Sequence, residues 1–334
     1  MSVVGSYPPG TVLCDIIYDM QEMVKEIIQE KRKVLKKFFG EYGKLAIVLG
    51  LLSVILASLL GVGRGIASSS LKVSFLDIGQ GDAILVQTPG GHDMLIDGGP
   101  SDRILEKLSQ EMSYFDRHLD VVVSTHPDAD HITGLIVVLQ KYDVDRIIIS
   151  PSKGHTGVFE VLQKSIDEEL LSRSEDSTLH KSIHVGKAGD TITFGDGVVA
   201  RIIYPAKNFH GNKKYTNDAS VSMVITYGNE SVLLTGDLPS TYERSLISAQ
   251  LPRNVTIYKA GHHGSKYSSG DVLLSYIRPE YAVISAGKDN TYGHPNPETI
   301  GRLKVYSQEI LSTIDRGTIT FLLDGKGVEL ETEK

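Results

Sequence analysis

Hydrophobic positions follow two different periods along this chain of 334 residues. From residue 72 onward, short apolar runs alternate with polar positions, a pattern typical of strands in half-buried sheets. The sequence predicts strands at residues 73–76, 83–86, 94–96, 121–123, 147–149, 191–194, 198–204, 221–227, 231–235, 255–258, 281–285 and 318–323. Helical spacing interrupts them at residues 103–112, 132–142, 158–171, 242–251 and 297–306. So many strands, with helices between them, indicate two sheets packed face to face under outer helices.

A different pattern occupies residues 45–62, eighteen consecutive residues without a charge, proline or asparagine. At 1.5 Å per residue, a helix of this length is about 27 Å long, which nearly matches the hydrocarbon thickness of a bilayer. We therefore expect a single, uncleaved transmembrane helix that anchors the chain in the lipid bilayer. A buried core helix is one alternative, but no flanking segment has an apolar face to cover it. A cleaved signal peptide is the other, although the 44 preceding residues are far more than a usual signal peptide has.

Basic residues on the two sides of this segment predict its orientation. Seven lysines and arginines lie within residues 25–44, whereas only Arg64 and Lys72 follow closely. Because cytoplasmic flanks carry the excess of positive charge, we expect a single-pass protein of the cell membrane with a cytoplasmic N-terminus. The expected parts are a partly helical cytoplasmic tail, a transmembrane helix, a linker and an extracytoplasmic hydrolase domain, at residues 1–44, 45–62, 63–71 and 72–334.

Composition restricts the chemistry of the C-terminal domain. Because Cys14 is the only cysteine, a metal ion must be held by histidines and carboxylates, and a disulfide framework is excluded. Residues 71–334 contain 26 lysines and arginines and 35 acidic residues, a net charge of −9. Such a balance disfavours non-specific wrapping of nucleic acid, which depends on basic residues. It is compatible with a nuclease, because metal ions can supply the positive charge.

The strongest functional signal follows one of the apolar strands. Residues 125–131 read Thr-His-Pro-Asp-Ala-Asp-His, so that His126, Asp128, Asp130 and His131 place four metal-binding side chains within six positions. Residues two apart in an extended backbone project alike, so His126 and Asp128 can share one ion. The other two can turn toward a second ion where the helix begins. Acidic residues also cap helix N-termini, but capping accounts for neither histidine.

Further candidate ligands stand at the ends of later predicted strands. They are Asp237 in Thr-Gly-Asp, His262 and His263 in Gly-His-His-Gly-Ser, and His294 in Tyr-Gly-His-Pro. Each motif alone is a weak signal, because Gly-Asp is a common turn and an isolated histidine is more often a surface or core residue. Their order along the chain and their placement at strand ends make them candidates for one joint site.

Together these motifs resemble the metallo-β-lactamase superfamily, and in detail the metallo-β-lactamase-like domain of ComEC-type competence proteins, the DNA-uptake channel family. The resemblance rests on seven segments in the family's order, at residues 75–83, 95–99, 126–131, 217–220, 235–237, 261–265 and 292–295. It implies an αββα metallo-β-lactamase sandwich, of mixed α+β class, with a two-metal hydrolytic site at one edge of the sheets. In the competence relatives it also implies a nuclease-like role on an outward-facing domain.

Two departures limit what the resemblance implies. Asp128 stands where the wider superfamily has histidine, a substitution that the competence-type members share, and the superfamily's separate middle histidine has no obvious counterpart. A single apolar helix cannot form a DNA-conducting bundle, so DNA uptake by this chain alone is not expected.

The resulting hypothesis is a membrane-anchored phosphodiesterase or nuclease that acts on DNA or another phosphodiester with two divalent ions. The expected ligands are His126, Asp128 and His294 on one ion, Asp130 and His131 on the other, and Asp237 as the bridging carboxylate. The expected catalytic residues are Asp130, His262 and His263, with one of the last two protonating the leaving group. Because Asp128 adds a hard oxygen donor, Mn²⁺ is a candidate beside Zn²⁺.

Residues near the ligands have two interpretations each. Asp97 either orients a metal-bound histidine or forms a turn, and residues 79–82 form either a tight turn or a phosphate cradle. Asn217 and Ser220 either act at the site or only shape a loop. The sequence also places Ser265 and Lys266 close enough to the histidine pair to touch a phosphate.

Two other functions remain open at this point. One is a metallo-hydrolase that cleaves a lactam, lactone or thioester, and the other is a non-catalytic binding module. A panel of substrates distinguishes the first from a phosphodiesterase, and the measured metal content tests the second.

Overall fold

The computed structural model of this protein describes residues 11–62, 70–113, 115–171, 182–206, 209, 215–249 and 251–334. The chain divides into two compact units, Met1–Val62 and Gly63–Lys334. The predicted linker at residues 63–71 lies outside the described residues except for its last two.

The first unit contains the helix α1 (Thr11–Val62), which includes the predicted transmembrane segment. Many apolar side chains of its described part are exposed, among them Ile47, Leu51 and Val54. In that described part, no single stretch is both long and apolar enough to cross a bilayer. The segments Met20–Phe38 and Tyr42–Ile55, which meet at an angle of 56°, are long and apolar enough when taken together.

The second unit is built on two sheets. The first has the strand order β15-β14-β1-β2-β3-β4-β5-β6, and the second has the order β13-β12-β11-β10-β9-β8-β7. Strands of the first sheet are β1 (Leu71–Phe75), β2 (Ile84–Gln87), β3 (Asp93–Ile96), β4 (His118–Ser124), β5 (Asp143–Ile149), β6 (Ser182–Val185), β14 (Ile319–Leu323) and β15 (Val328–Thr332). Strands of the second are β7 (Thr191–Thr193), β8 (Val199–Tyr204), β9 (Ser222–Tyr227), β10 (Glu230–Leu234), β11 (Ile257–Lys259), β12 (Tyr281–Ile284) and β13 (Glu309–Ser312).

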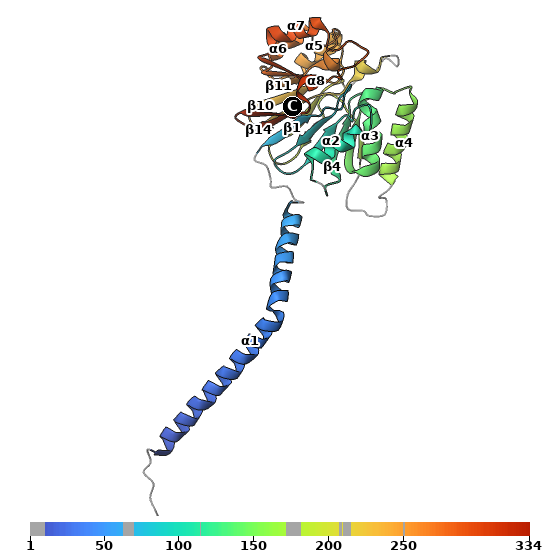
Figure 1. Cartoon of the computed structure of the whole chain (residues 1–334). Coiled ribbons are helices and arrows are strands. Elements are labelled where there is room, and N and C mark those ends of the chain that lie inside the picture. The colour runs from blue at the N-terminus through green and yellow to red at the C-terminus, as the bar shows by residue number, and fades with distance from the viewer. Residues whose placement is uncertain are drawn as a thin grey trace, which may run out of the picture. The chain divides into compact units, whose positions relative to one another are not determined.

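Helices cover the outer faces of both sheets (Figure 1). Helices α2 (Arg103–Glu111), α3 (Ala129–Lys141) and α4 (Gly157–Leu171) gather over the first sheet. Helices α5 (Ser240–Ser248), α6 (Asp271–Ile277) and α7 (Pro297–Tyr306) gather over the second. The two-sheet sandwich under outer helices that the sequence predicts is therefore confirmed.

Three buried apolar clusters hold these layers together. The largest lies between the sheets, where Phe75 of β1 meets Phe321 of β14 edge to face, with ring centroids 6.0 Å apart. The second cluster joins the first sheet to its helices, and the third joins the second sheet to α5, α6 and α7. Because the central strands are buried on both faces, some of them contain consecutive apolar residues rather than a strict alternation, as β4 does at Val121–Val123.

Strands that the sequence did not predict lie at the edges. β6 and β15 carry mostly exposed or half-buried side chains, and β13 has a single buried residue. An edge strand pairs with a neighbouring strand on one side only and can carry polar side chains. It therefore needs no apolar run, and hydrophobic patterning does not reveal it. The short helices α6 and α8 (Thr313–Arg316) were also missed.

Candidate metal centre

The loop after β4 contributes four of the predicted ligands. His126 and His131 are fully buried, whereas Asp128 and Asp130 remain partly exposed. Asp128 stands at the N-cap position of α3, yet its side chain makes no capping hydrogen bond in the described structure. It accepts a hydrogen bond from the Thr216 hydroxyl instead. Helix capping therefore does not explain this acidic residue, and its carboxylate faces the site.

The second sheet contributes the other side of the site. Asp237 follows β10, and His262 and His263 lie on the short 3₁₀ helix Gly261–Gly264 that follows β11. Both histidines have a left-handed backbone, with φ values of 49° and 54°, which bulky residues seldom adopt without a compensating role. His263 is buried and His262 is about one-third exposed, with a side-chain exposure of 31%.

Asp237 Oδ2 lies among the imidazoles of four histidines. Its distances to the Nε2 atoms are 3.4 Å for His131, 3.5 Å for His262 and His263, and 3.7 Å for His126. These separations are longer than a hydrogen bond of about 2.9 Å. They are close to the ~3.4 Å expected between two ligand atoms that each lie about 2.1 Å from one tetrahedral ion. The side chains therefore have the spacing of atoms that share metal ions.

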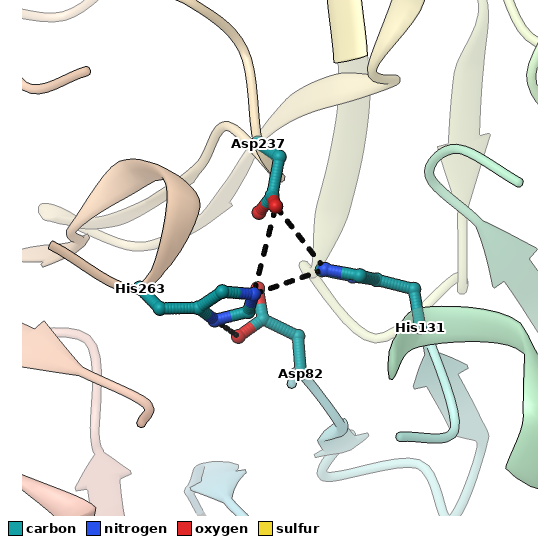
Figure 2. Close-up of side chains that lie close together, drawn as sticks. All are labelled: Asp82, His131, Asp237 and His263. Carbon is teal, nitrogen blue, oxygen red and sulfur yellow. Dashed lines mark hydrogen bonds and ion pairs between the residues drawn. The ribbon is translucent and has the colours of Figure 1, made fainter. Parts of the chain in front are cut away.

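Two subgroups surround this carboxylate. On one side, His126 Nε2 lies 3.7 Å from Asp128 Oδ2. On the other, His263 Nε2 lies 3.3 Å from Asp130 Oδ2 and 3.2 Å from His131 Nε2. Figure 2 shows His131, His263 and Asp237 converging on one point, with Asp82 against the far edge of the His263 ring. The central position of Asp237 fits the bridging role that the sequence suggests.

Unpartnered polar atoms test whether metal ions suit this site. His126 Nε2 and Asp237 Oδ1 are buried and have no hydrogen-bond partner among the described residues. A buried polar atom left without a partner costs about 1–3 kcal/mol, so such atoms are rare outside functional sites. Divalent ions, coordinated by imidazole and carboxylate, would satisfy both atoms, and the residues present fit them.

The electrostatics of the site also favour a cation. Burial disfavours the charged forms of these groups, but the surrounding carboxylates, Asp237 first, raise the pKa of His131 well above its ordinary value. Asp237 and Asp82 likewise raise the pKa of His263 to about 9. The pKa of Asp237 lies well below its usual range despite burial, because His263 and His131 are so close. The carboxylates thus create a negative potential at the position where positive charge is needed.

Asp97 connects the ligand loop to the strand beside it. Its carboxylate accepts hydrogen bonds from the Thr125 amide at 2.8 Å and the Thr125 hydroxyl at 2.6 Å, and it contacts His131 Nδ1 at 2.8 Å. A hydrogen bond at Nδ1 leaves Nε2 of the same ring for a metal, as is usual for metal-binding histidines. Of the two interpretations of Asp97, the orienting one therefore matches the contacts.

Asp82 and Lys259 form a buried layer behind His263 that sequence reasoning missed. Lys259 Nζ lies 2.8 Å from Asp82 Oδ2, and Asp82 Oδ1 lies 3.2 Å from His263 Nδ1. Burial alone would raise the pKa of Asp82, but Lys259 and His263 outweigh it and hold the pKa below its usual range. The available signal was a lysine at the end of an otherwise apolar strand, directly before the Gly-His-His-Gly motif.

The turn at residues 79–82 presses against the ligand loop. A Cβ atom on Gly81 would lie 2.0 Å from the backbone oxygen of Asp130, and φ of Gly81 is 122°. Only glycine allows this close approach. The turn joins β1 to β2 and carries Asp82 into the site, as the tight-turn interpretation requires.

His294, the other expected ligand of the first ion, lies next to His262. Its ring packs on His262 at a centroid distance of 5.4 Å and stacks on Tyr292 at 5.8 Å. No contact with His126 or Asp128 joins it to their subgroup in the described structure. Its Nδ1 is buried without a hydrogen-bond partner among the described residues. His263 rather than His294 therefore lies with the ligands of the loop after β4.

The remaining candidates, Asn217, Ser220, Ser265 and Lys266, differ in burial and in contacts. Asn217 accepts a hydrogen bond at 3.2 Å from Thr216, the residue that binds Asp128. The Ser220 hydroxyl is buried without a hydrogen-bond partner among the described residues. Ser265 is buried, and its hydroxyl accepts a hydrogen bond from the Tyr267 amide at 3.4 Å. Lys266 is exposed beside the histidine pair.

Comparison with known proteins agrees with this geometry. The sequence pattern of the Beta-lactamase superfamily domain matches residues 92–266, more than half of the chain. ComE operon protein 3 of Bacillus subtilis is 28% identical over 271 residues, which cover 76% of this chain and 33% of that protein. Competence protein ComA of Neisseria gonorrhoeae is 27% identical over 277 residues, which cover 80% of this chain and 34% of that protein. The chain thus spans about a third of the length of these relatives.

Solved structures include similar folds at low sequence identity. A metallo hydrolase of the archaeon Ignicoccus hospitalis is 16% identical, with a TM-score of 0.44, over 75% of this chain and 98% of the archaeal one. The match of the superfamily pattern, the related competence proteins and the buried cluster of histidines and aspartates lead to one conclusion. This chain belongs to the Beta-lactamase superfamily, and its C-terminal unit is a metallo-β-lactamase domain related to those of competence proteins.

Proposed function

We propose that this protein is a membrane-anchored phosphodiesterase that cleaves nucleic acid with two divalent ions. The observation that carries the proposal is the position of Asp237 Oδ2, within 3.7 Å of the Nε2 atoms of four histidines. A carboxylate between two ligand subgroups suits a pair of ions, and ion pairs a few ångströms apart are typical of phosphodiester hydrolysis. The competence relatives support nucleic acid as the substrate.

His126 and Asp128 would hold one ion, and Asp130, His131 and His263 would hold the other, with Asp237 shared between them. Two such ions supply a nucleophilic water at neutral pH and neutralise charge on the phosphate. Asp97 fixes the ring of His131 through Nδ1. Within this assignment His263 is a ligand and not an acid.

His262 is then the residue available to protonate the leaving oxygen. It is partly exposed, whereas His263 is buried and its Nδ1 already contacts the Ser285 carbonyl at 3.0 Å. Its Nε2 atom lies 3.5 Å from Asp237 Oδ2, so that a proton held there is next to the proposed metal pair. The protonated, cationic form of an imidazole can donate in this way and becomes neutral imidazole as the leaving oxygen takes the proton.

The proposal is tested with the full chain, stripped with chelator and reloaded separately with Mn²⁺ or Zn²⁺. We expect metal-dependent cleavage of single-stranded or double-stranded DNA and little hydrolysis of lactams, lactones or thioesters. Hydrolysis of a lactam, lactone or thioester without cleavage of DNA would identify a metallo-hydrolase of a different substrate class. If the protein contains no bound metal, both as isolated and after reloading, the result would instead indicate a non-catalytic binding module.

Asp128 is expected to shift metal preference toward Mn²⁺, because a carboxylate is a harder donor than the imidazole of the wider superfamily. Asp128→His should therefore raise Zn²⁺-supported activity relative to Mn²⁺-supported activity. The measurement is the ratio of the two activities in wild type and variant, with metal content determined for each sample. An unchanged ratio in fully loaded proteins would show that Asp128 does not set the preference.

For the membrane anchor, we propose that residues 45–62 span the cell membrane with the N-terminus in the cytoplasm. Seven basic residues lie within residues 25–44 and two follow closely, which favours this orientation. A reporter enzyme that is active only outside the cytoplasm should therefore be active when it is fused after Ser70. A reporter that is active only in the cytoplasm should be inactive at the same position. Activity of the matched cytoplasmic reporter at the same fusion point would reverse the topology.

A further inference from the structure

Three exposed aromatic side chains lie within a few residues, along the chain, of residues at the metal centre. Among the described residues of the second unit, four aromatic side chains are more than half exposed: Phe115, Tyr215, Tyr267 and Tyr292, at 72%, 52%, 66% and 66%. Tyr215 precedes Thr216, which binds Asp128, and Tyr292 lies two residues before His294. Tyr267 lies four residues after His263. Only Phe115, which precedes β4, stands at the other end of that strand from the ligand loop.

Tyr267 and Tyr292 are each supported by the protein on one side. The ring of Tyr292 stacks on His294 with an interplanar angle of 22° and a centroid distance of 5.8 Å. Lys266 Nζ lies 5.3 Å from the centroid of the Tyr267 ring. Both side chains nevertheless keep about two-thirds of their surface in water. Apolar rings held in place but left uncovered are suited to a flat aromatic ligand.

Asn296 ties the loops of these two tyrosines together. Its Oδ1 accepts a hydrogen bond from the Lys266 amide at 2.8 Å, and its Nδ2 donates to the Gly293 carbonyl at 3.0 Å. Lys266 precedes Tyr267 and Gly293 follows Tyr292, so each tyrosine is the chain neighbour of a residue that Asn296 holds. The Arg302 guanidinium also donates to the Lys266 carbonyl at 3.1 Å. The two rings are therefore carried on fixed loops, which reduces the entropy lost when a ligand binds.

The charge of the unit indicates how such a ligand is held. With a net charge of −9 over residues 71–334, this unit is poorly suited to binding a polyanion through lysines and arginines. Stacking of bases on aromatic side chains contributes affinity without many basic residues, and it tolerates any base sequence. Bases in a duplex have their faces covered, so this mode selects unpaired bases.

We propose that Tyr267 and Tyr292 form a stacking platform for unpaired nucleobases of a single-stranded nucleic acid whose backbone enters the metal centre. The inference rests on the proposed phosphodiesterase function and adds a binding subsite and a strand preference to it. Lys266, beside Tyr267, is placed to meet a phosphate of the same strand. The affinity for a substrate then depends on the presence of unpaired bases beside the cleaved bond, and not on which bases they are.

The test measures binding and cleavage separately. The full chain is titrated, after metal removal, with a fluorescent oligothymidylate and with an abasic oligomer of the same length, and affinities are read from fluorescence anisotropy. Wild type should bind the base-bearing strand more tightly than the abasic strand. Loss of each ring, in Tyr267→Ala or Tyr292→Ala, should weaken binding of the base-bearing strand roughly fivefold to a hundredfold. The doubly substituted protein should no longer distinguish the two strands.

Control variants separate stacking from folding. Tyr267→Phe and Tyr292→Phe keep an aromatic ring and should bind like wild type, and Phe115→Ala removes an exposed ring far from the site and should have no effect. Equal binding of both strands by wild type, or an unchanged preference in the doubly substituted protein, would overturn the stacking platform. Absence of Mn²⁺-dependent cleavage of either strand would count against the phosphodiesterase alone, since the binding measurement does not depend on catalysis.

Discussion

Asp237→Ala is expected to lower metal-dependent hydrolysis by about a thousandfold or more, because the proposed two-ion mechanism loses its shared ligand. The carboxylate lies within 3.7 Å of the Nε2 atoms of four histidines, and no other described carboxylate has that position. Bound metal should fall in parallel, which inductively coupled plasma mass spectrometry measures directly. The three apolar clusters are untouched by this change, so the sandwich should remain folded.

Asp289→Ala serves as the matched control, because Asp289 is exposed on the loop after β12. It should keep wild-type activity and metal content. Near-normal turnover by folded Asp237→Ala would refute the bridging role. Loss of the folded circular dichroism spectrum would show instead that Asp237 is needed for the fold, and Asp237→Asn, which preserves shape, then tests the metal role.

Lys259→Met is expected to destabilise the protein by about 3–5 kcal/mol, since it removes the lysine that lies against the buried Asp82 carboxylate. The two side chains are 0% and 2% exposed, and their Nζ and Oδ2 atoms are 2.8 Å apart. Methionine has a similar length and no charge, so the packing volume changes little. Urea denaturation measures the change in unfolding free energy. Because Asp82 also contacts His263 Nδ1, hydrolysis should decrease at temperatures where the variant is still folded.

The double variant Asp82→Asn with Lys259→Met provides the matched comparison. Removing both charges together should restore much of the stability, because replacing a buried pair as a whole costs far less than removing one partner. It should not restore hydrolysis if Asp82 positions the ring of His263. A destabilisation below about 1 kcal/mol for Lys259→Met would mean that the ion pair is not the reason for this buried lysine.

The sandwich could be predicted because its central strands are buried on both faces. Strands β4 and β10 each contain three consecutive buried apolar residues, Val121–Val123 and Val232–Leu234, and the number of such runs excluded a doubly wound sheet. The edge strands β6, β13 and β15 escaped prediction for the opposite reason, since exposed edges tolerate polar residues. Helix α6 is only seven residues long, too short to establish a helical period.

The sequence could predict only those parts of the site whose residues lie together in one short segment. Residues 126–131 place four ligand types in one loop, so their proximity follows from the chain itself. Asp237, by contrast, lies far along the chain from this loop, and nothing in residue type shows that it is buried at 2% exposure. The pairing of Asp82 with Lys259 joins positions far apart in the chain. The position of His263 beside Asp130 and His131 depends on how the two sheets pack, which residue type does not reveal.

The division of the candidate ligands between the two sheets has a consequence for stability. His126, Asp130 and His131 belong to the first sheet's loops, whereas Asp237 and His263 belong to the second sheet's. An ion bound by both sets would act as a further cross-link between layers that already adhere through apolar contact and through polar contacts such as the Lys259–Asp82 pair. By mass action it would add about 4 kcal/mol to the unfolding free energy at a thousandfold excess over its dissociation constant. The melting temperature of this protein would then report the metal concentration of its surroundings.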